Sequence, residues 1–222
     1  MQVEWYGQSA FRLAARDATV FIDPFGDTSG FAGRGIRFEY PAIEGVAADL
    51  VLVTHEHADH NGVEAIEGEP AVLRSTAGRL ESPLGEVLAV ASEHDPVAGT
   101  QRGPNTIFRF EFDGVAVCHF GDFGQTALRD EQAEAIGSVD LLFLPVGAGP
   151  TIGPDQAEAV VRRLAPRWVV PMHYNTPRIG FLEPAEPFLE LMPRVQPMDG
   201  TSFETADLPA GEGPLVVLPT AP

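Results

Sequence analysis

The feature that most constrains this chain is an apolar segment that ends in a histidine-rich turn. Residues 49–54 read Asp-Leu-Val-Leu-Val-Thr, a pattern typical of a strand buried on both faces. The next six residues are His55, Glu56, His57, Ala58, Asp59 and His60. Histidines and carboxylates gathered at the end of a buried strand are typical of a site held by a rigid scaffold. The segment therefore predicts a sheet that carries its chemistry at the strand ends.

Three more candidate ligands follow predicted strands further along the chain. His94 and Asp122 follow strands expected at residues 86–91 and 115–120, and His173 follows a buried strand. In α/β sheets the strand ends that share one edge bring distant residues together at a site. We therefore expect these side chains to join the histidine-rich turn.

The spacing within the turn suits two metal ions. Side chains two residues apart in an extended segment point the same way, so His55 and His57 can face one ion. Asp59 and His60 lie beyond the bend and can face a second ion, which the two carboxylate oxygens of Asp122 could bridge to the first. Imidazole and carboxylate ligands suit zinc and other borderline first-row metals, and no cysteine stands among these positions. The residues therefore favour a dinuclear site over a structural zinc site.

The rest of the chain reads as short strands followed by alternating strands and helices. Residues 1–22 predict an antiparallel meander, and Asp113-Gly114 predicts the turn of a later hairpin. Residues 23–45 are rich in glycine and bounded by proline, which favours a long loop that serves a site. The second half predicts a helix at 127–136, a strand at 140–144, a helix at 154–164 and a strand at 168–170. This order indicates one layered α/β domain over residues 1–222, with helices that cover sheets.

Charge and composition exclude several classes of protein. All 14 basic residues are arginine, so kinase, P-loop and aldolase chemistry, which needs a lysine, is excluded. The net charge of -18 repels phosphate backbones and anionic lipid, so neither nucleic acid nor a membrane is expected as a partner. The single cysteine, Cys118, permits no intrachain disulfide and is expected in the core. With no basic leader and no apolar run near the ~20 residues that span a bilayer, we expect a cytoplasmic protein.

The histidine-rich turn also carries a resemblance to a known family. His55, His57, Asp59 and His60 match, without a gap, the H-x-H-x-D-H signature of the metallo-β-lactamase-fold hydrolases, and the later ligands of that family match His94, Asp122 and His173. Within the family the chain resembles the bacterial branch of ascorbate-6-phosphate lactonase-like proteins, through WYGQSAF at 5–11, RGPNTIF at 102–108 and LPVG at 144–147. The resemblance runs from residue 3 to about residue 176. Gln8 departs from it, because many members have histidine there.

The resemblance implies a four-layer αββα sandwich with the metal site between the sheet edges. It implies one ion held by His55, His57 and His94, a second held by Asp59, His60 and His173, and Asp122 as the bridge between them. Two divalent cations are therefore the expected cofactors. Zinc is the first choice, and manganese is the alternative because this branch has manganese-associated members and carboxylates suit that metal.

The implied activity is that of a metal-dependent hydrolase. Two cations lower the pKa of water to about 7, and the resulting hydroxide attacks an ester, lactone or phosphodiester of a small molecule. Asp59 is the expected proton acceptor. Two alternatives stay open: a metal-dependent nuclease, which the charge of -18 opposes, and a metal-occupied binding or sensing protein without turnover. The residues predict no oligomeric state.

Five other residues each have two interpretations. Asp23 can hydrogen-bond a ligating histidine or cap a turn before proline. Arg102 and Asn105 can orient an anionic substrate or fix their own loop. His119 is either a buried, supporting residue on its strand or a proton carrier. Tyr174 either donates a hydrogen bond to developing charge or packs against its neighbours.

Acidic residues also flank the predicted ligands. Glu56, Glu93 and Asp95 are expected to add to the negative charge of Asp59 and Asp122. Like charges held close together repel one another unless cations screen them. We therefore expect removal of the ions to destabilise the protein.

Overall fold

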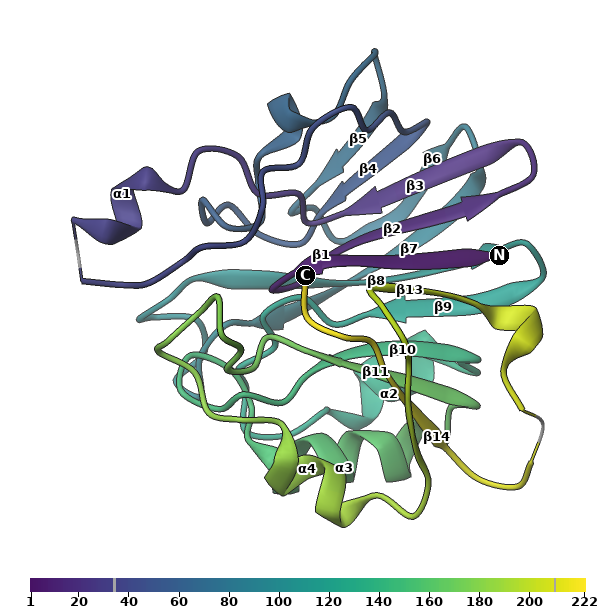
Figure 1. Ribbon diagram of the computed structural model, residues 1–222. Coiled ribbons are helices and arrows are strands. Elements are labelled where there is room, and N and C mark those ends of the chain that lie inside the picture. Colours follow the sequence, from purple (N-terminus) through teal and green to yellow (C-terminus); the bar gives the residue numbers. More distant parts are fainter. Residues whose placement is uncertain (34, 210) are drawn as a thin grey trace.

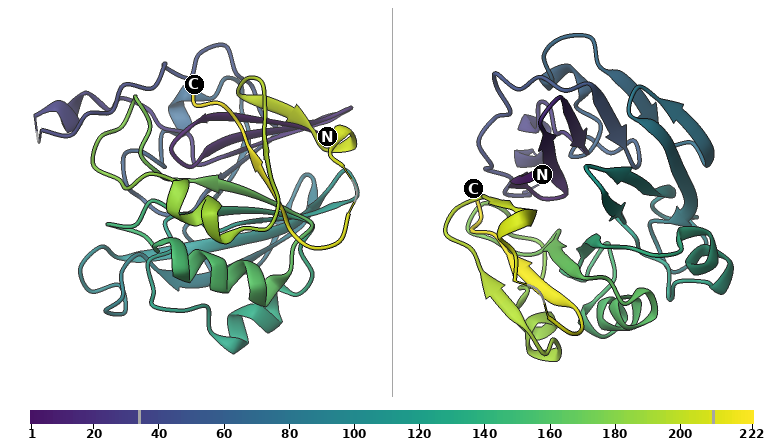
Figure 2. Two further views of the ribbon diagram at one scale, coloured as in Figure 1. Left: turned by 60° about the horizontal axis from the view of Figure 1, so that its bottom comes forward. Right: turned by 90° about the vertical axis from the view of Figure 1, so that its right-hand side faces the viewer.

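Two β-sheets lie face to face in the computed structural model, which describes residues 1–33, 35–209 and 211–222 (Figure 1). Within these residues, one sheet has the strand order β13-β1-β2-β3-β4-β5 and the other has the order β12-β14-β11-β10-β9-β8-β7-β6. Viewed from the side, the two layers separate clearly (Figure 2). The mixed α/β class predicted from the sequence is confirmed.

The first sheet begins as the antiparallel meander predicted for residues 1–22. Its strands are β1 (Gln2–Gly7), β2 (Ala10–Ala15), β3 (Ala18–Ile22), β4 (Leu50–Val53), β5 (Ala71–Arg74) and β13 (Ser202–Glu204). Strands β4 and β5 extend the meander in parallel fashion, while β13 pairs with β1 in the antiparallel sense. Every residue of β4 is buried, which confirms the strand expected from the apolar run.

The second sheet combines an antiparallel part with a parallel part. Its strands are β6 (Gly78–Ser82), β7 (Gly85–Glu93), β8 (Pro104–Phe112), β9 (Val115–His119), β10 (Leu141–Pro145), β11 (Trp168–Met172), β12 (Val195–Pro197) and β14 (Leu215–Leu218). Strands β6 to β9 are antiparallel, and β9, β10, β11, β14 and β12 run parallel. The parallel strands end on the same side, which is where the candidate site lies.

Three helices gather on the outer side of the eight-stranded sheet: α2 (Asp130–Ile136), α3 (Pro154–Leu164) and α4 (Glu186–Leu191) (Figure 1). Helix α3 has the predicted bounds, with proline in its first turn. Helix α2 begins at Asp130 instead of residue 127. The reason is local, because the side chain of Gln132 accepts a hydrogen bond from the Arg129 N–H (3.0 Å) and so fixes the helix start.

The outer face of the six-stranded sheet is covered by irregular chain more than by helix. The loop predicted for residues 23–45 is confirmed there; among its described residues it contains the short helix α1 (Ser29–Ala32), which projects away from the sheets (Figures 1 and 2). The 3₁₀ turn η1 (Val63–Ala65) adds to this layer. Tyr40 and Phe25 from the loop pack in one apolar cluster with sheet residues such as Phe21.

The main core fills the space between the two sheets. Leu13 and Leu50 from the first sheet share one buried cluster with Phe108 and Phe143 from the second. The rings of Phe11 and Phe143 meet across this interface with centroids 4.4 Å apart. Burial of such large side chains stabilises each by about 1.5–3 kcal/mol relative to exposure. The core therefore sets how the edges of the two sheets face each other.

No helix within the described residues is long and apolar enough to cross a bilayer.

Candidate metal centre

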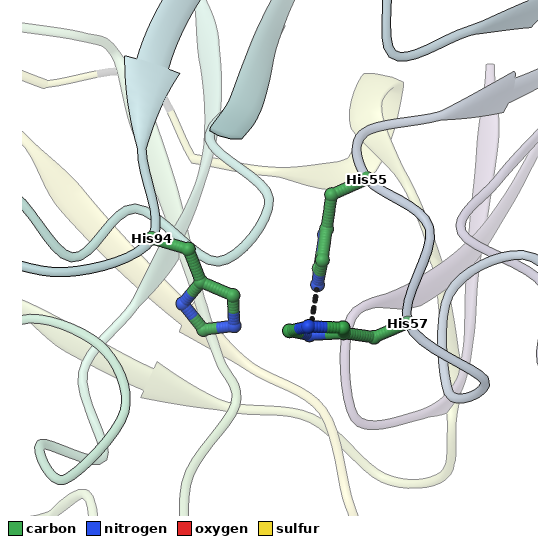
Figure 3. A group of neighbouring side chains, drawn as sticks. All are labelled: His55, His57 and His94. Atoms are coloured by element: carbon green, nitrogen blue, oxygen red, sulfur yellow. Dashed lines mark hydrogen bonds between the residues drawn. The ribbon is translucent and has the colours of Figure 1, made fainter. Parts of the chain in front are cut away.

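Seven histidine and aspartate side chains converge where strands of both sheets end. Their ligand atoms fall into three overlapping groups, each within 4.8 Å: His55, His57 and His94; His55, His60 and Asp122; and Asp59, His60 and His173. Figure 3 shows the first group, in which His55 Nε2 lies 3.0 Å from His57 Nδ1. The structure thus brings together all seven residues that the sequence singled out.

A tight turn after β4 separates the two halves of the histidine-rich segment. The backbone N–H of His60 and that of Asn61 both donate to the carbonyl of His57, at 2.9 and 3.1 Å. This turn bends the chain so that Asp59 and His60 group with His173, whereas His55 and His57 group with His94. The two-sided arrangement expected from the spacing is therefore present in the geometry.

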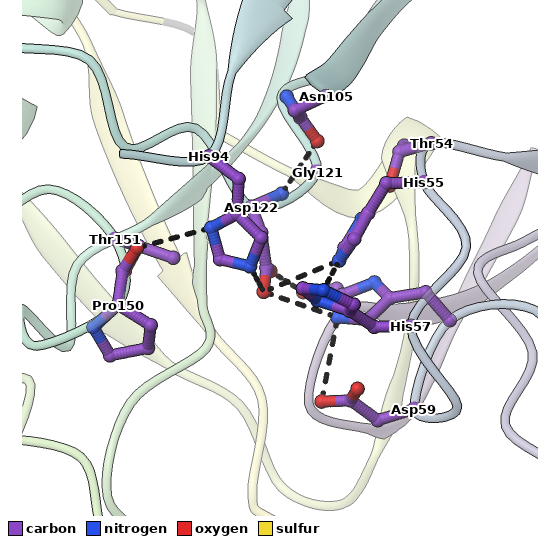
Figure 4. A network of polar contacts seen from close by, with 12 residues as sticks. Thr54, His55, His57, Asp59, His94, Asn105, Gly121, Asp122, Pro150 and Thr151 are labelled. Carbon is purple, nitrogen blue, oxygen red and sulfur yellow. Dashed lines mark hydrogen bonds and ion pairs between the residues drawn. The ribbon is translucent and has the colours of Figure 1, made fainter. Parts of the chain in front are cut away.

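Asp122 lies between the two groups (Figure 4). Its Oδ2 is 3.1 Å from His94 Nε2 and 3.1 Å from His173 Nε2, 3.3 Å from His60 Nε2 and 3.8 Å from His55 Nε2. One carboxylate oxygen thus faces four imidazole nitrogens. This is the position that a carboxylate shared by two cations would occupy.

Asn105 holds Asp122 in place. Its Oδ1 accepts the Asp122 backbone N–H (3.0 Å), and its Nδ2 donates to the Phe120 carbonyl (2.8 Å). The preceding Gly121 has φ +55°, and a Cβ there would come within 2.6 Å of Thr54 and Asn105 side-chain atoms. Asn105 does not line the cavity described below. The observed contacts therefore match its structural interpretation.

The ring nitrogens of His60 and His94 that face away from the cluster have hydrogen-bond acceptors. His60 Nδ1 donates to Asp23 Oδ2 (2.9 Å), and His94 Nδ1 donates to the Pro150 carbonyl (3.1 Å). Because a carboxylate and a carbonyl can only accept, both rings carry their proton on Nδ1. In their neutral form both rings therefore direct the Nε2 lone pair at the cluster, which is the tautomer that a metal requires.

Thr54 extends the support from Asp23 to His55. The Thr54 hydroxyl donates to Asp23 Oδ2 (2.8 Å) and lies 3.1 Å from His55 Nδ1. Since its proton is committed to the carboxylate, its oxygen accepts from the His55 ring. Asp23 thereby orients two histidines, one directly and one through a hydroxyl. The sequence raised the first possibility for Asp23 but gave no signal for Thr54.

The electrostatics of the cluster favour an ionised Asp122 and a neutral His55. Burial would raise the pKa of Asp122, but the nearby imidazoles of His173 and His60 outweigh it and hold that pKa well below its usual value. Burial together with the charge of His60 keeps the pKa of His55 well below normal. These are the protonation states in which both residue types bind metals.

His60 is the exception, and it points to a cation. Burial would lower its pKa, but Asp122, Asp59 and Asp23 raise it well above the usual value. Its Nε2 is fully buried without a hydrogen-bond partner among the described residues, although Asp122 Oδ2 lies 3.3 Å away. A buried polar atom of this kind is normally satisfied. A divalent cation between His60 and the carboxylates would supply the missing partner, so the residues present fit metal ions.

His119 and Tyr174, two more residues with open roles, are both buried near the site. His119 is buried; its Nε2 donates to the Ser9 carbonyl (3.0 Å) and its Nδ1 accepts the Gly121 N–H (3.1 Å). Tyr174 is buried beside Trp5, with ring centroids 5.5 Å apart. Neither lines the cavity, so the supporting interpretation of His119 and the packing interpretation of Tyr174 match the observed contacts.

Gln8 contacts the cluster although the sequence gave it no role. Its Nε2 donates to Asp59 Oδ2 (3.2 Å), and the neighbouring Ser9 hydroxyl donates to Asp122 Oδ1 (3.4 Å). Both residues belong to the segment between β1 and β2. The only available signal was that this segment carries the family resemblance.

The acidic neighbours of the candidate ligands have partners of their own. Glu56 forms an ion pair with Arg74 (2.5 Å), and Glu93 forms one with Arg129 (2.5 Å). Asp95 accepts backbone N–H groups from its own loop. Arg74 and Arg129 therefore compensate the charges of Glu56 and Glu93, whereas Asp95 keeps its charge and is held by neutral N–H donors. The expected destabilisation on removal of the ions stays a prediction.

A cavity of about 510 Å³ opens onto the cluster. Asp59, Asp122, His57, His94 and His173 lie on its wall, together with Phe31, Ile36, Glu56, Ala58, Gln101, Arg102, Pro150 and Phe181. This size suits a small-molecule ligand.

Histidines and carboxylates at the facing edges of two stacked sheets, with helices outside the eight-stranded one, are typical of metal-binding α/β sandwich proteins. Residues 2–173 match the family described as the Beta-lactamase superfamily domain, and the chain belongs to that superfamily. The UPF0173 metal-dependent hydrolase of Thermococcus kodakarensis is 31% identical over 207 residues, which cover 79% of this chain and 85% of the relative. That of Pelotomaculum thermopropionicum is 32% identical over 216 residues, covering 84% and 90%.

A solved structure extends the similarity to the whole chain. It comes from Thermotoga maritima, is described as a Zn-dependent hydrolase of the metallo-beta-lactamase superfamily, and covers 99% of both chains with a TM-score of 0.77 and 29% identity. The fold implied by the resemblance is confirmed, while the lactonase-like branch stays a prediction.

Proposed function

We propose that this protein hydrolyses an ester, lactone or phosphodiester bond of a small molecule with the help of two divalent cations. As a member of this superfamily, with relatives named metal-dependent hydrolases, the chain is a metal-dependent hydrolase. The proposal adds the number of ions, their ligands and the class of bond.

The position of Asp122 carries the proposal. Its Oδ2 lies within 3.8 Å of an imidazole Nε2 from each of His55, His60, His94 and His173. A single tetrahedral ion takes at most four ligands, whereas seven candidate side chains converge here. We assign one ion to His55, His57 and His94, the other to Asp59, His60 and His173, and the bridge to Asp122. Zinc is our first choice, with manganese as the alternative.

The chain's own residues prepare the site for hydrolysis. Divalent cations, when bound, polarise a substrate oxygen and lower the pKa of water to about 7. Asp59 lines the cavity, and Gln8 Nε2 holds its Oδ2. Asp59 can therefore take a proton from the attacking water while its orientation stays fixed. The cavity admits a small substrate beside this carboxylate, and we propose a small molecule as the partner rather than a polymer.

The test compares one preparation in several metal states. The protein is stripped with a chelator, reloaded with zinc or manganese, and its metal content is measured by elemental analysis. Each sample is assayed with p-nitrophenyl esters, aliphatic lactones and bis-p-nitrophenyl phosphate. We expect two ions per chain and turnover of at least one class, lost on chelation and regained on reloading. A sample with two ions that hydrolyses none of them would favour the binding or sensing alternative instead.

A further inference from the structure

We propose that Arg102 makes the cavity selective for substrates that carry a carboxylate or phosphate several bonds away from the hydrolysed bond. The inference rests on the proposed function, because it names the substrate class of the same site. It assigns Arg102 the substrate-orienting role that the sequence left open.

The first observation is the charge of the cavity wall. Arg102 is the one arginine among the described residues that line the cavity. The cavity carboxylates have other partners, since Glu56 pairs with Arg74 and Asp122 faces the histidines. Arg102 itself has no ion pair within the described part of the chain. A guanidinium presents several donors in a planar fork that fits carboxylate and phosphate oxygens.

The second observation is that most arginines of this acidic chain do have carboxylate partners. Ion pairs join Arg12, Arg74, Arg79, Arg109, Arg129, Arg162, Arg163 and Arg167 to aspartate or glutamate. With 32 acidic residues against 14 arginines, a partner is easy to find on this surface. Arg102 stands apart because it lines the cavity and lacks one.

The third observation is that the backbone beneath Arg102 is fixed. Buried Asp95 accepts the N–H groups of Val97 and Gly99 on Oδ1 (both 2.9 Å) and those of Gln101 (2.9 Å) and Arg102 (2.8 Å) on Oδ2. One carboxylate thus holds the whole loop that follows His94. A side chain on a fixed base loses less conformational freedom when it binds a ligand.

The fourth observation concerns the rest of the wall. Phe31, Ile36 and Phe181 also line the cavity, and the Phe181 ring lies 6.5 Å from that of His173. Apolar side chains beside the cluster suit a hydrocarbon segment of the substrate. A substrate with its reacting bond at the cluster, an apolar spacer and an anionic end would contact the cluster, the apolar side chains and Arg102 with these three parts.

The experiment uses three p-nitrophenyl esters of equal chain length. The adipate monoester ends in a carboxylate, the 5-phosphonopentanoate ester ends in a phosphonate, and the hexanoate ester ends in a methyl group. The metal-loaded wild type is compared with Arg102→Gln and Arg102→Lys. Arg16→Gln is the matched control, because Arg16 is exposed, does not line the cavity and changes the net charge equally.

In Arg102→Gln we expect kcat/KM for an anionic ester to fall about tenfold, as expected for one lost charge-assisted hydrogen bond, mainly through KM. Hexanoate turnover should stay within about twofold, Arg102→Lys should recover part of the loss, and Arg16→Gln should lose nothing. The ratio of carboxylate to phosphonate turnover identifies the preferred anion. An equal loss for all three esters, or no loss for either anion, would overturn the inference.

A binding measurement separates this inference from the proposed function. Adipate monoanilide carries the same anionic end on an unreactive amide, and its Kd is measured by calorimetry with metal-loaded protein. A Kd about tenfold weaker in Arg102→Gln supports the anion contact even if no ester is hydrolysed. Equal Kd values, or no binding to the wild type, refute the contact even if hexanoate is turned over.

Discussion

The carboxylate of Asp23 uses both of its oxygens to build the candidate metal centre. Oδ1 accepts the Thr54 N–H, while Oδ2 accepts from the Thr54 hydroxyl and from His60 Nδ1. The residue itself has φ +50°, in the left-handed region that aspartate tolerates better than most residues. These contacts match the interpretation in which Asp23 supports a candidate ligand, because its side-chain partners within the described residues are Thr54 and His60 and not the turn that begins at Pro24.

Replacing Asp23 with asparagine tests this support. The amide has one acceptor oxygen where three donors now meet, so His60 and, through Thr54, His55 lose their fixed orientation. We expect metal affinity to fall about 10- to 100-fold, as is typical for such supporting residues. Zinc affinity is measured by competition with a chromophoric chelator. Asp27→Asn, an exposed change in the same loop, is the control; equal affinity in both variants would rule out the supporting role.

Replacing Asp59 with asparagine tests the proposed proton acceptor. Asparagine keeps an oxygen of the same shape but cannot take up the proton, so metal content should be retained while kcat falls about 10²- to 10⁴-fold. Without ions, burial would raise the pKa of Asp59, but the charge of His60 outweighs burial and lowers that pKa below its usual value. The Asp59 carboxylate is therefore ionised and able to accept a proton until the pH falls toward this lowered pKa. The acidic limb of kcat/KM should vanish in the variant. If kcat and the limb are both unchanged, Asp59 is a ligand only.

At the residue scale, the convergence of the candidate ligands was predictable and the residues that support them were not. His55 to His60 stand next to each other in the chain, and the other ligands follow recognisable strands. Thr54 and Ser9 are ordinary residues whose hydroxyls matter only because the fold places them beside Asp23 and Asp122. No local pattern records such a distant contact.

At the scale of elements, strand β9 shows how a secondary-structure element sets the chemistry at its end. Its last residue, His119, connects Ser9, which lies between β1 and β2, with Gly121, which precedes Asp122. The ring packs against Phe11 and Phe143. Only the neutral ring can both donate to the carbonyl and accept the N–H.

His119 should make stability depend on pH. Burial holds its pKa below the usual 6.5, so the unfolded chain takes up the proton first. Its contribution is therefore complete above pH 6.5 and is lost as pH falls through the lower folded-state pKa, by up to about 1.4 kcal/mol per pH unit. In metal-free protein, urea unfolding of His119→Gln should show a shallower pH slope than the wild type. The other histidines are common to both proteins and cancel; parallel slopes would contradict the assignment.

The predictability of each element follows from its burial. Strands β4, β10 and β11 are wholly buried and read as apolar runs, and α3 begins with a proline signal. Strand β6, with the sequence GRLES, is an edge strand without a fully buried residue, so no alternation reveals it. Short β12 and β13 depend on pairing with strands elsewhere in the chain. Tertiary contacts, rather than local preference, create these strands.

At the scale of the whole molecule, the ions should contribute to stability as ligands of the folded state. Binding to the folded chain alone stabilises it by about 2.7 kcal/mol when the free metal is at 100 times Kd. We expect chelation to lower the melting temperature in scanning calorimetry, and zinc to restore it. Because Glu56 and Glu93 are already paired with arginines, whereas Asp59, Asp95 and Asp122 are not, added salt should restore only part of the loss. An unchanged melting temperature after complete removal of the metal would contradict this coupling.

The ligands come from both sheets: His55 to His60 follow β4 of the first sheet, while His94, Asp122 and His173 follow β7, β9 and β11 of the second. The distances within the candidate metal centre therefore depend on how the two sheets are aligned. A slip of one sheet against the other, caused by a substitution deep in the shared core, changes ligand distances without altering any ligand. Selection for activity thus also acts on residues such as Leu13 and Phe108, which lie in that core and do not line the cavity.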